Sequence, residues 1–200
     1  MKKIIYLITL IFCFNNIYSQ NYFLENTSPY DEEIKTPEEF LGYEIGFQHT
    51  RHDLIIEYLS YLSDFSEKAH LVNYGKSHEG RKLVFLIVSS SINIENLEKI
   101  KKENIEFIKS GQLNKDLPII VNLGYNVHGN EPSSSEAAML TAFTLVASKN
   151  KKIERFRNNS VVFIDPTINP DGRDRHTQWA NQFKSINLVA DSNDAEHNEA

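Results

Sequence analysis

The sequence has 200 residues, enough for one domain with a substantial hydrophobic core. Its composition, 40% hydrophobic and 24% charged residues, is ordinary for a globular protein. The formal net charge is -6, from 27 acidic and 21 basic residues. A nucleic-acid partner is therefore not expected, because binding phosphates requires a surplus of Lys and Arg on one face.

The first residues predict export. Lys2 and Lys3 precede an apolar run over residues 4–14, and the small residue Ser19 follows. The run is shorter than the about 20 apolar residues that a transmembrane helix needs. We expect a signal peptide over residues 1–19, a periplasmic or secreted protein, and no membrane association after cleavage. An uncleaved anchor or a first core helix is the alternative.

The single cysteine, Cys13, lies inside this predicted signal. Bulky Phe12 precedes it, where lipid modification of a cysteine requires a small residue, so we reject that modification. The processed chain would have no cysteine and no disulfide. Any metal site must then use His, Asp and Glu.

The chain after the signal begins with a lead-in segment, residues 20–49, whose first part is polar, without periodicity and expected to be extended. A capping box at Thr36-Pro37-Glu38-Glu39 predicts a helix start. A weaker box at residues 50–53 opens a second helix. The apolar face expected for that helix consists of Leu54, Ile55, Tyr58, Leu59 and Leu62.

A hairpin is predicted next, with strands at residues 71–74 and 82–89 and with Gly75 and Glu79-Gly80-Arg81 in the connection. A long amphipathic helix over residues 93–110 should end at Gly111. The residues expected to face inward are Ile94, Leu97, Ile105 and Ile108.

Two short apolar runs, residues 118–123 and 161–164, are typical of buried strands, and the first is expected to be central and covered on both faces. A helix from residue 132 to about 149 lies between them. Strand, helix and strand in this order predict a crossover unit. The expected fold is therefore α/β, a mixed, mostly parallel sheet flanked by helices, with no internal repeat or domain boundary.

Polar residues with metal-binding chemistry follow each of these two strands. His128 and Glu131 follow the first strand, and residues 165–172 follow the second. Sites in open α/β sheets form at the carboxyl ends of strands, and zinc accepts imidazole and carboxylate ligands. Gly129 would relax a turn that lets both side chains reach one ion. The spacing alone is weak, since a helix cap at Glu131 and a structural turn at residues 169–172 explain the same residues.

Three ordered motifs carry a resemblance to a known family. They are Gly75-Lys76-Ser77-His78-Glu79-Gly80-Arg81-Lys82-Leu83, His128-Gly129-Asn130-Glu131 and Asn169-Pro170-Asp171-Gly172. Together they resemble the zinc carboxypeptidase family of secreted metallopeptidases. The similarity runs from about residue 50 to residue 171.

The resemblance implies that His128 and Glu131 are the first two ligands of one Zn²⁺ per complete domain. The ion would polarise the scissile carbonyl and activate a water molecule. The implied substrates are peptide or protein C-termini, and we expect a monomer. The family also uses an arginine to stabilise the developing oxyanion. Arg175 is the candidate, preferred to Arg173, although a count without gaps leads to Lys184.

Other parts of the family pattern are missing. The third ligand (a His), an Asn-Arg pair for the substrate carboxylate, an Asp that orients the first His and a glutamate general base are all expected after residue 200. Residues 50–200 are therefore expected to be the N-terminal part of a catalytic domain, truncated at the C-terminus and inactive alone. His197 is interpreted as a solvated loop residue, and Trp179 and Phe183 as core residues. The histidines interpreted as surface or helix-end residues are His49, His52, His70, His78 and His176.

Three functional hypotheses follow. The first is a zinc carboxypeptidase. The second is a deacylase or amidase on the same scaffold. The third is a non-catalytic fragment, because two ligands without a third hold zinc poorly.

Overall fold

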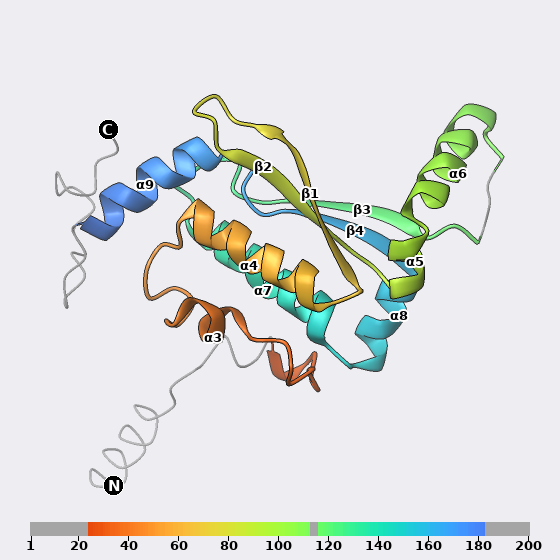
Figure 1. The fold of residues 1–200 in the computed structure, drawn as a ribbon, viewed down its shortest axis with the longest axis horizontal. Coiled ribbons are helices and arrows are strands. Elements are labelled where there is room, and N and C mark those ends of the chain that lie inside the picture. Colours follow the sequence, from red (N-terminus) through yellow and green to blue (C-terminus); the bar gives the residue numbers. More distant parts are fainter. Residues whose placement is uncertain (1–23, 113–115, 183–200) are drawn as a thin grey trace, which may run out of the picture.

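The computed structural model describes residues 24–112 and 116–182 (Figure 1). The expectations for the signal peptide, Cys13, Phe183, Lys184 and His197 lie outside the described residues. No helix in the described part of the chain is long and apolar enough to cross a membrane. The helices and strands are α3 (Pro37–Leu41), α4 (His52–Phe65), β1 (Ala69–Lys76), β2 (Lys82–Val88), α5 (Ser91–Glu95), α6 (Leu97–Ser110), β3 (Ile119–Gly124), α7 (Ser133–Ala147), α8 (Lys151–Asn159), β4 (Ser160–Asp165) and α9 (Pro170–Gln182).

The four described strands form one mixed sheet in the order β1-β2-β4-β3, which confirms the α/β fold class. β3 and β4 pair in parallel, as the crossover prediction requires. β1 pairs with β2, and β2 with β4, in antiparallel fashion. Parallel pairing is thus less common in this part of the sheet than the sequence suggested. The hairpin that contributes two of the four strands is antiparallel by construction.

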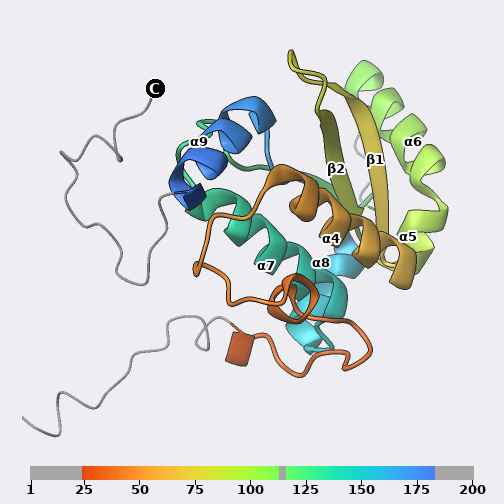
Figure 2. The ribbon, with the colours of Figure 1, turned by 60° about the vertical axis from the view of Figure 1, so that its left-hand side comes forward.

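Alternating side chains place the sheet between two helical layers. On β2, Leu86 and Val88 join a core shared with α4 and α7, whereas Ile87 joins a second core shared with α5 and α6. β4 alternates in the same way, because successive strand residues point to opposite faces. Figure 2 shows α4 and α7 on one side of the sheet and α6 on the other. The main core is therefore the α4–α7 layer against the sheet.

The single helix predicted over residues 93–110 is instead two helices. Asn96, at φ -105° and ψ 17°, separates α5 from α6, and α6 ends at Gly111 as expected. The break changes which residues of α6 face the sheet. Ile100 is buried, while Ile105 and Ile108 are 43% and 77% exposed, so their predicted burial was wrong.

β3 differs from its predicted central position. Among the described residues it has a neighbouring strand on one edge alone, and Ile119 is 68% exposed. Apolar composition indicates that a strand favours burial, but it does not identify the segment that covers it.

The described part of the lead-in segment, residues 24–49, packs against α7. The backbone N–H of Asp31 donates to the carbonyl of Ala147 at 2.8 Å, and that of Lys149 donates to Pro29 at 2.7 Å. The Tyr30 ring stacks on Phe143 with centroids 4.8 Å apart. Residues 29–31 thus pack against the C-terminal half of α7 and the residues that follow it. The polar sequence of residues 20–35 did not indicate this contact.

Candidate functional site

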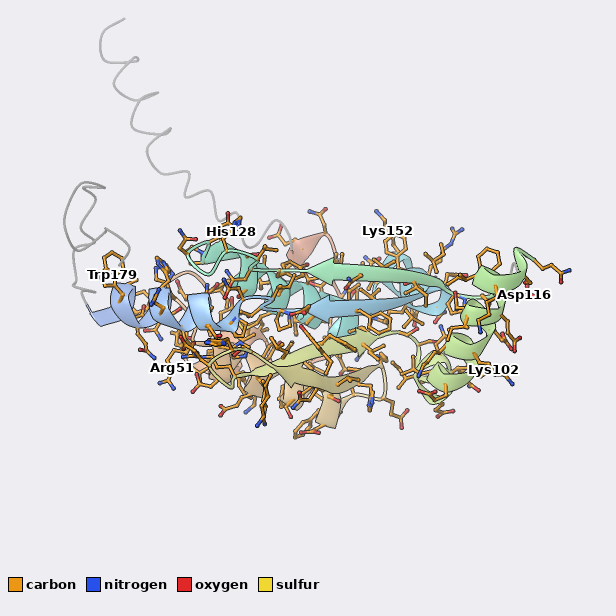
Figure 3. The ribbon with its side chains drawn as sticks, turned by 90° about the horizontal axis from the view of Figure 1, so that it is seen from above. Arg51, Lys102, Asp116, His128, Lys152 and Trp179 are labelled. Carbon is orange, nitrogen blue, oxygen red and sulfur yellow. The ribbon has the colours of Figure 1, made fainter. Side chains whose placement is uncertain are left out.

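The loops after β3 and β4 lie side by side at one end of the sheet. The N–H of Tyr125 donates to the carbonyl of Asp165 at 2.9 Å, and the N–H of Ile168 donates back to Tyr125 at 3.0 Å. Figure 3 shows His128 and Trp179 at this end, away from Lys102 and Asp116. The predicted meeting of two loops at the carboxyl ends of parallel strands is confirmed.

His128 and Glu131 come together in the first loop. The Nδ1 atom of His128 lies 3.3 Å from Oε1 of Glu131, and their side chains are 72% and 60% exposed. The N–H of Glu131 donates to the His128 carbonyl at 3.1 Å, which closes a tight turn. Two ligands of a tetrahedral zinc ion with ordinary bond lengths are about 3.3 Å apart. The nitrogen and oxygen present here therefore fit a zinc ion.

Glu131 does not cap the following helix. Pro132 occupies the N-cap position of α7 and makes no side-chain capping hydrogen bond. The carboxylate of Glu131 faces His128 instead. No group of three or more His, Cys, Asp or Glu side chains able to hold a metal is found within residues 24–112 and 116–182. The described part of the site thus supplies two donors.

Asn169-Pro170-Asp171-Gly172 is the first turn of a helix rather than an isolated turn. Oδ1 of Asn169 accepts a hydrogen bond from the N–H of Gly172 at 3.0 Å, and the Asn169 carbonyl accepts from Arg173 at 3.0 Å. Asn169 therefore acts as the cap of α9, with Pro170 at the first helical position. The structural turn that the sequence suggested at residues 169–172 is therefore continued as a helix.

Two of the motifs are in direct backbone contact. A Cβ atom at Gly129 would lie 2.0 Å from the carbonyl carbon of Gly172 and 2.3 Å from the backbone nitrogen of Arg173. No side chain fits there without moving one of the two backbones. The glycine between the two candidate ligands is thus required by close approach to α9, in addition to any need for a turn.

The third motif, the hairpin turn, docks on the same helix. Asp171 accepts hydrogen bonds from Oγ of Ser77 at 2.6 Å, from the N–H of Glu79 at 3.1 Å and from Nη1 of Arg81 at 2.8 Å. The Nε atom of Arg81 also donates to Asp174 at 2.7 Å. Burial acts to raise the pKa of Asp171, but these hydrogen bonds outweigh it and hold the pKa below its usual value. All three motifs therefore form one connected structure.

Arg173, the second-choice oxyanion candidate, is completely buried. Its guanidinium donates to the carbonyl of Thr50 at 2.8 and 3.0 Å, to the carbonyl of Pro132 at 2.8 Å and to Oε1 of Glu136 at 2.7 Å. Glu136, also buried, accepts from the N–H of Thr50 at 2.8 Å. Residues 126–131, here called the ligand loop, pack against the backbone of Arg173 at Gly129. Arg173 has no exposed surface with which to contact a substrate. The sequence did not predict this network; the signal for it was Glu136, the single charged residue of α7.

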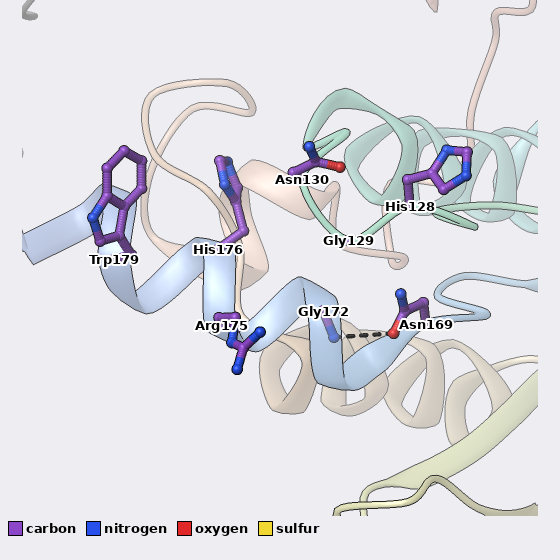
Figure 4. A pocket seen from close by; sticks show the side chains of 8 residues that line it. All are labelled: His128, Gly129, Asn130, Asn169, Gly172, Arg175, His176 and Trp179. Atoms are coloured by element: carbon purple, nitrogen blue, oxygen red, sulfur yellow. Dashed lines mark hydrogen bonds between the residues drawn. The ribbon is translucent and has the colours of Figure 1, made fainter. Parts of the chain in front are cut away.

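A cavity of about 270 Å³ lies between the ligand loop and α9 (Figure 4). Its lining residues are His128, Gly129, Asn130, Asn169, Gly172, Arg175, His176 and Trp179. Arg175, His176 and Trp179 all come from α9. The structure thus brings Arg175 to the same cavity as His128, while Glu131 is not among the lining residues.

Several expectations for rings near the site were wrong. Trp179 lines the cavity, half-buried, rather than packing into the core. His176 is half-buried in the cavity wall, and its ring centroid lies 5.1 Å from that of His49. His52 is a helix-end residue as predicted but is buried, with Nε2 2.8 Å from the Lys82 carbonyl. His70 and His78 are exposed, as predicted. The first two differences arise because α9, a helix that was not predicted, carries both residues to the cavity wall.

Comparisons with known proteins gave the following similarities. Among solved structures, carboxypeptidase A from Helicoverpa armigera is similar, with 21% identity and a TM-score of 0.50 over 70% of this chain and 28% of that one. Thrombin activatable fibrinolysis inhibitor matches with 15% identity and a TM-score of 0.48, over 64% and 27%. The chain spans less than a third of the length of either structure.

No curated protein sequence matches the chain significantly. A family model described as zinc carboxypeptidase matches residues 55–195, well over half of the chain and all three motifs. The likeness to carboxypeptidase A extends to the fold, a mixed sheet flanked by helices. On this evidence the chain belongs to the zinc carboxypeptidase family.

Proposed function

We propose that this protein is a zinc-dependent metallocarboxypeptidase that removes C-terminal residues from peptides. The observation that carries the proposal is the 3.3 Å approach of His128 Nδ1 and Glu131 Oε1 in an exposed loop beside a cavity. An imidazole nitrogen and a carboxylate oxygen are suitable zinc ligands where thiolates are absent. Membership of the family supports the same ion and the same class of substrate.

His128 and Glu131 would hold the zinc ion through these two atoms. When bound, zinc polarises a carbonyl and lowers the pKa of a bound water molecule. Arg175 supplies a positive charge in the wall of the cavity. We assign it the role of donating hydrogen bonds to the carbonyl oxygen of the scissile bond as negative charge develops there. Peptide C-termini suit such a cationic cavity, because they are carboxylates.

We place the third ligand and the general base beyond residue 200. A polypeptide of residues 1–200 alone should then have negligible peptidase activity, since the loss of a general base costs roughly 10²–10⁴-fold in rate. Zinc-dependent hydrolysis of a blocked dipeptide by this polypeptide would contradict the placement.

We also propose that the protein is exported and monomeric. The basic and apolar pattern of residues 1–19 supports a cleaved signal peptide. Residues 14–200 contain no cysteine, which is compatible with an oxidising compartment. N-terminal sequencing of the exported protein should begin at Gln20.

The function is tested on protein expressed from its complete gene. Metal analysis should find about one zinc per chain, and His128→Ala and Glu131→Gln should each reduce that content. A blocked dipeptide with a free C-terminal carboxylate should be hydrolysed faster than its C-terminal amide. Zinc content unaffected by both substitutions contradicts the ligand assignment. Equal or faster hydrolysis of the amide favours the amidase on the same scaffold.

A further inference from the structure

Asn126 lies between the end of β3 and the ligand loop, and its side chain is buried with 1% of its surface exposed. Its φ of 53° is in the left-handed region, and it is the sole non-glycine residue with positive φ in the described part of the chain. Asparagine adopts this conformation more readily than most residues. The backbone therefore turns sharply just before His128.

The side-chain amide of Asn126 binds both ligand residues. Its Nδ2 donates to the carbonyl of His128 at 2.8 Å and to the carbonyl of Glu131 at 3.0 Å. Both amide protons are thus used on the two residues that carry the candidate zinc donors. Oδ1 is buried with no hydrogen-bond partner among the described residues, so the two donated bonds determine the orientation of the amide.

The backbone of Asn126 is itself fixed by two helices. Its N–H donates to Oγ of Ser134, in the first turn of α7, at 2.8 Å. Its carbonyl accepts from the N–H of Asn169, the cap of α9, at 3.1 Å. The residue that holds the ligand loop is therefore anchored to two elements that do not carry the ligands.

We propose that Asn126 is a positioning residue that presets the spacing of His128 and Glu131 for the metal. The inference rests on the proposed zinc site. Exposed side chains lose conformational freedom when they bind an ion, and a loop already closed by the Asn126 amide leaves less freedom to lose. The ion then meets two donors already 3.3 Å apart.

Asn126→Gly isolates this role from backbone strain. Glycine adopts positive φ without steric cost, so the substitution keeps the turn and deletes both donated hydrogen bonds. Asn122→Gly is the matched control, because Asn122 is an exposed asparagine on β3, four residues earlier. A general effect of an Asn→Gly substitution near the end of β3 would weaken zinc binding in both variants.

The measurement is the zinc dissociation constant of the protein expressed from its complete gene. The protein is stripped with a chelator and titrated with zinc in competition with a chromophoric chelator. Asn126→Gly should bind zinc about 10–100-fold more weakly, the range found when groups that orient metal ligands are removed. Asn122→Gly should retain wild-type affinity. An Asn126→Gly variant with wild-type affinity overturns the positioning role.

Asn126→Asp provides a second test if the glycine variant does not fold. Aspartate keeps the shape and the tolerance of positive φ but cannot donate to either carbonyl. Its negative charge attracts a cation, so weaker zinc binding than in Asn122→Asp supports the positioning role, and equal or tighter binding overturns it.

His128→Ala distinguishes failure of the proposed zinc site from failure of the positioning role. If His128→Ala binds zinc with wild-type affinity, both the zinc site and the positioning role are contradicted. If His128→Ala loses zinc affinity while Asn126→Gly keeps it, the positioning role alone is overturned.

Discussion

Arg173 and Glu136 form a buried ion pair whose remaining hydrogen bonds reach Thr50 and Pro132. One guanidinium thereby joins the start of α4, the start of α7 and α9. Oε2 of Glu136 is buried without a partner among the described residues. The carboxylate therefore depends on Arg173 for compensation of its charge.

Arg173→Met should reduce the free energy of unfolding by about 3–5 kcal/mol, because it leaves the Glu136 carboxylate buried and uncompensated. Urea unfolding measures the change. Arg155→Met, at an exposed position on α8, is the control and should change stability by less than about 0.5 kcal/mol. The double variant Arg173→Met, Glu136→Leu should recover part of the loss. A single-variant effect no larger than the control would show that the pair is not needed.

Gly129→Ala should destabilise the fold by about 2–3 kcal/mol or more, since its Cβ would lie 2.0 Å from the backbone of Gly172. The loop or α9 must move, so zinc affinity should fall in parallel. Gly75→Ala is the control, because its Cβ meets nothing nearer than a Leu83 side-chain carbon at 3.9 Å. Thermal unfolding and zinc titration of both variants check the contact. Equal behaviour of the two alanines would disprove the close approach.

Arg175→Ala should lower kcat about 10²–10³-fold, the cost of removing one oxyanion donor. Zinc content should not change, because the residue lines the cavity without being a ligand. Steady-state kinetics with metal analysis separates the two effects, and Arg155→Ala should leave both unchanged. A kcat within a factor of two of wild type would remove Arg175 from the mechanism.

At the scale of elements, α9 is the helix on which the parts of the site meet. The hairpin turn, the ligand loop and Thr50, just before α4, all contact its first turns through Asp171, Gly172 and Arg173. Much of this contact is polar. Its strength should therefore depend on pH through Asp171.

The folded-state pKa of Asp171 is below its ordinary value of 3.8, so its contribution to stability is present above about pH 4 and is lost as pH falls through the folded-state value. Asp171→Asn removes this contribution at neutral pH. The difference in Tm between wild type and variant should be largest near pH 6 and should shrink towards pH 2.5. Burial raises the pKa of Asp165, so that residue makes the protein more stable as the pH falls. Wild type and variant share this contribution, so it cancels in the difference between their Tm values. A difference independent of pH would contradict the account.

The sequence predicted those elements that local patterns determine. The capping box at Thr36 is present with both of its hydrogen bonds, and β4 occupies Ser160–Asp165 around the predicted run. α8 was not predicted, and only a structural turn at residues 169–172 was suggested where α9 begins, because both helices are polar. In α9 the capping hydrogen bond that Asn169 accepts from the N–H of Gly172 outweighs the low helix propensity of that glycine.

At the scale of the whole molecule, the pairing of two loops could be predicted because parallel strands present their carboxyl ends at the same edge. The supporting contacts could not. Arg81 with Asp171, Gly129 with Gly172 and Arg173 with Glu136 each join residues that are tens of positions apart. A local pattern can mark one residue as unusual, as Glu136 is in α7, but it does not identify the distant residue that it contacts. The exposed edge of β3 is likewise a property of the assembled sheet.

The central claim is that Nδ1 of His128 and a carboxylate oxygen of Glu131 bind one zinc ion. Anomalous diffraction at the zinc absorption edge, from crystals of the protein expressed from its complete gene, tests it most directly. One strong peak is expected about 2.0–2.2 Å from both atoms. A zinc peak coordinated by other side chains, or no peak at this loop in crystals grown with zinc, would contradict the ligand assignment.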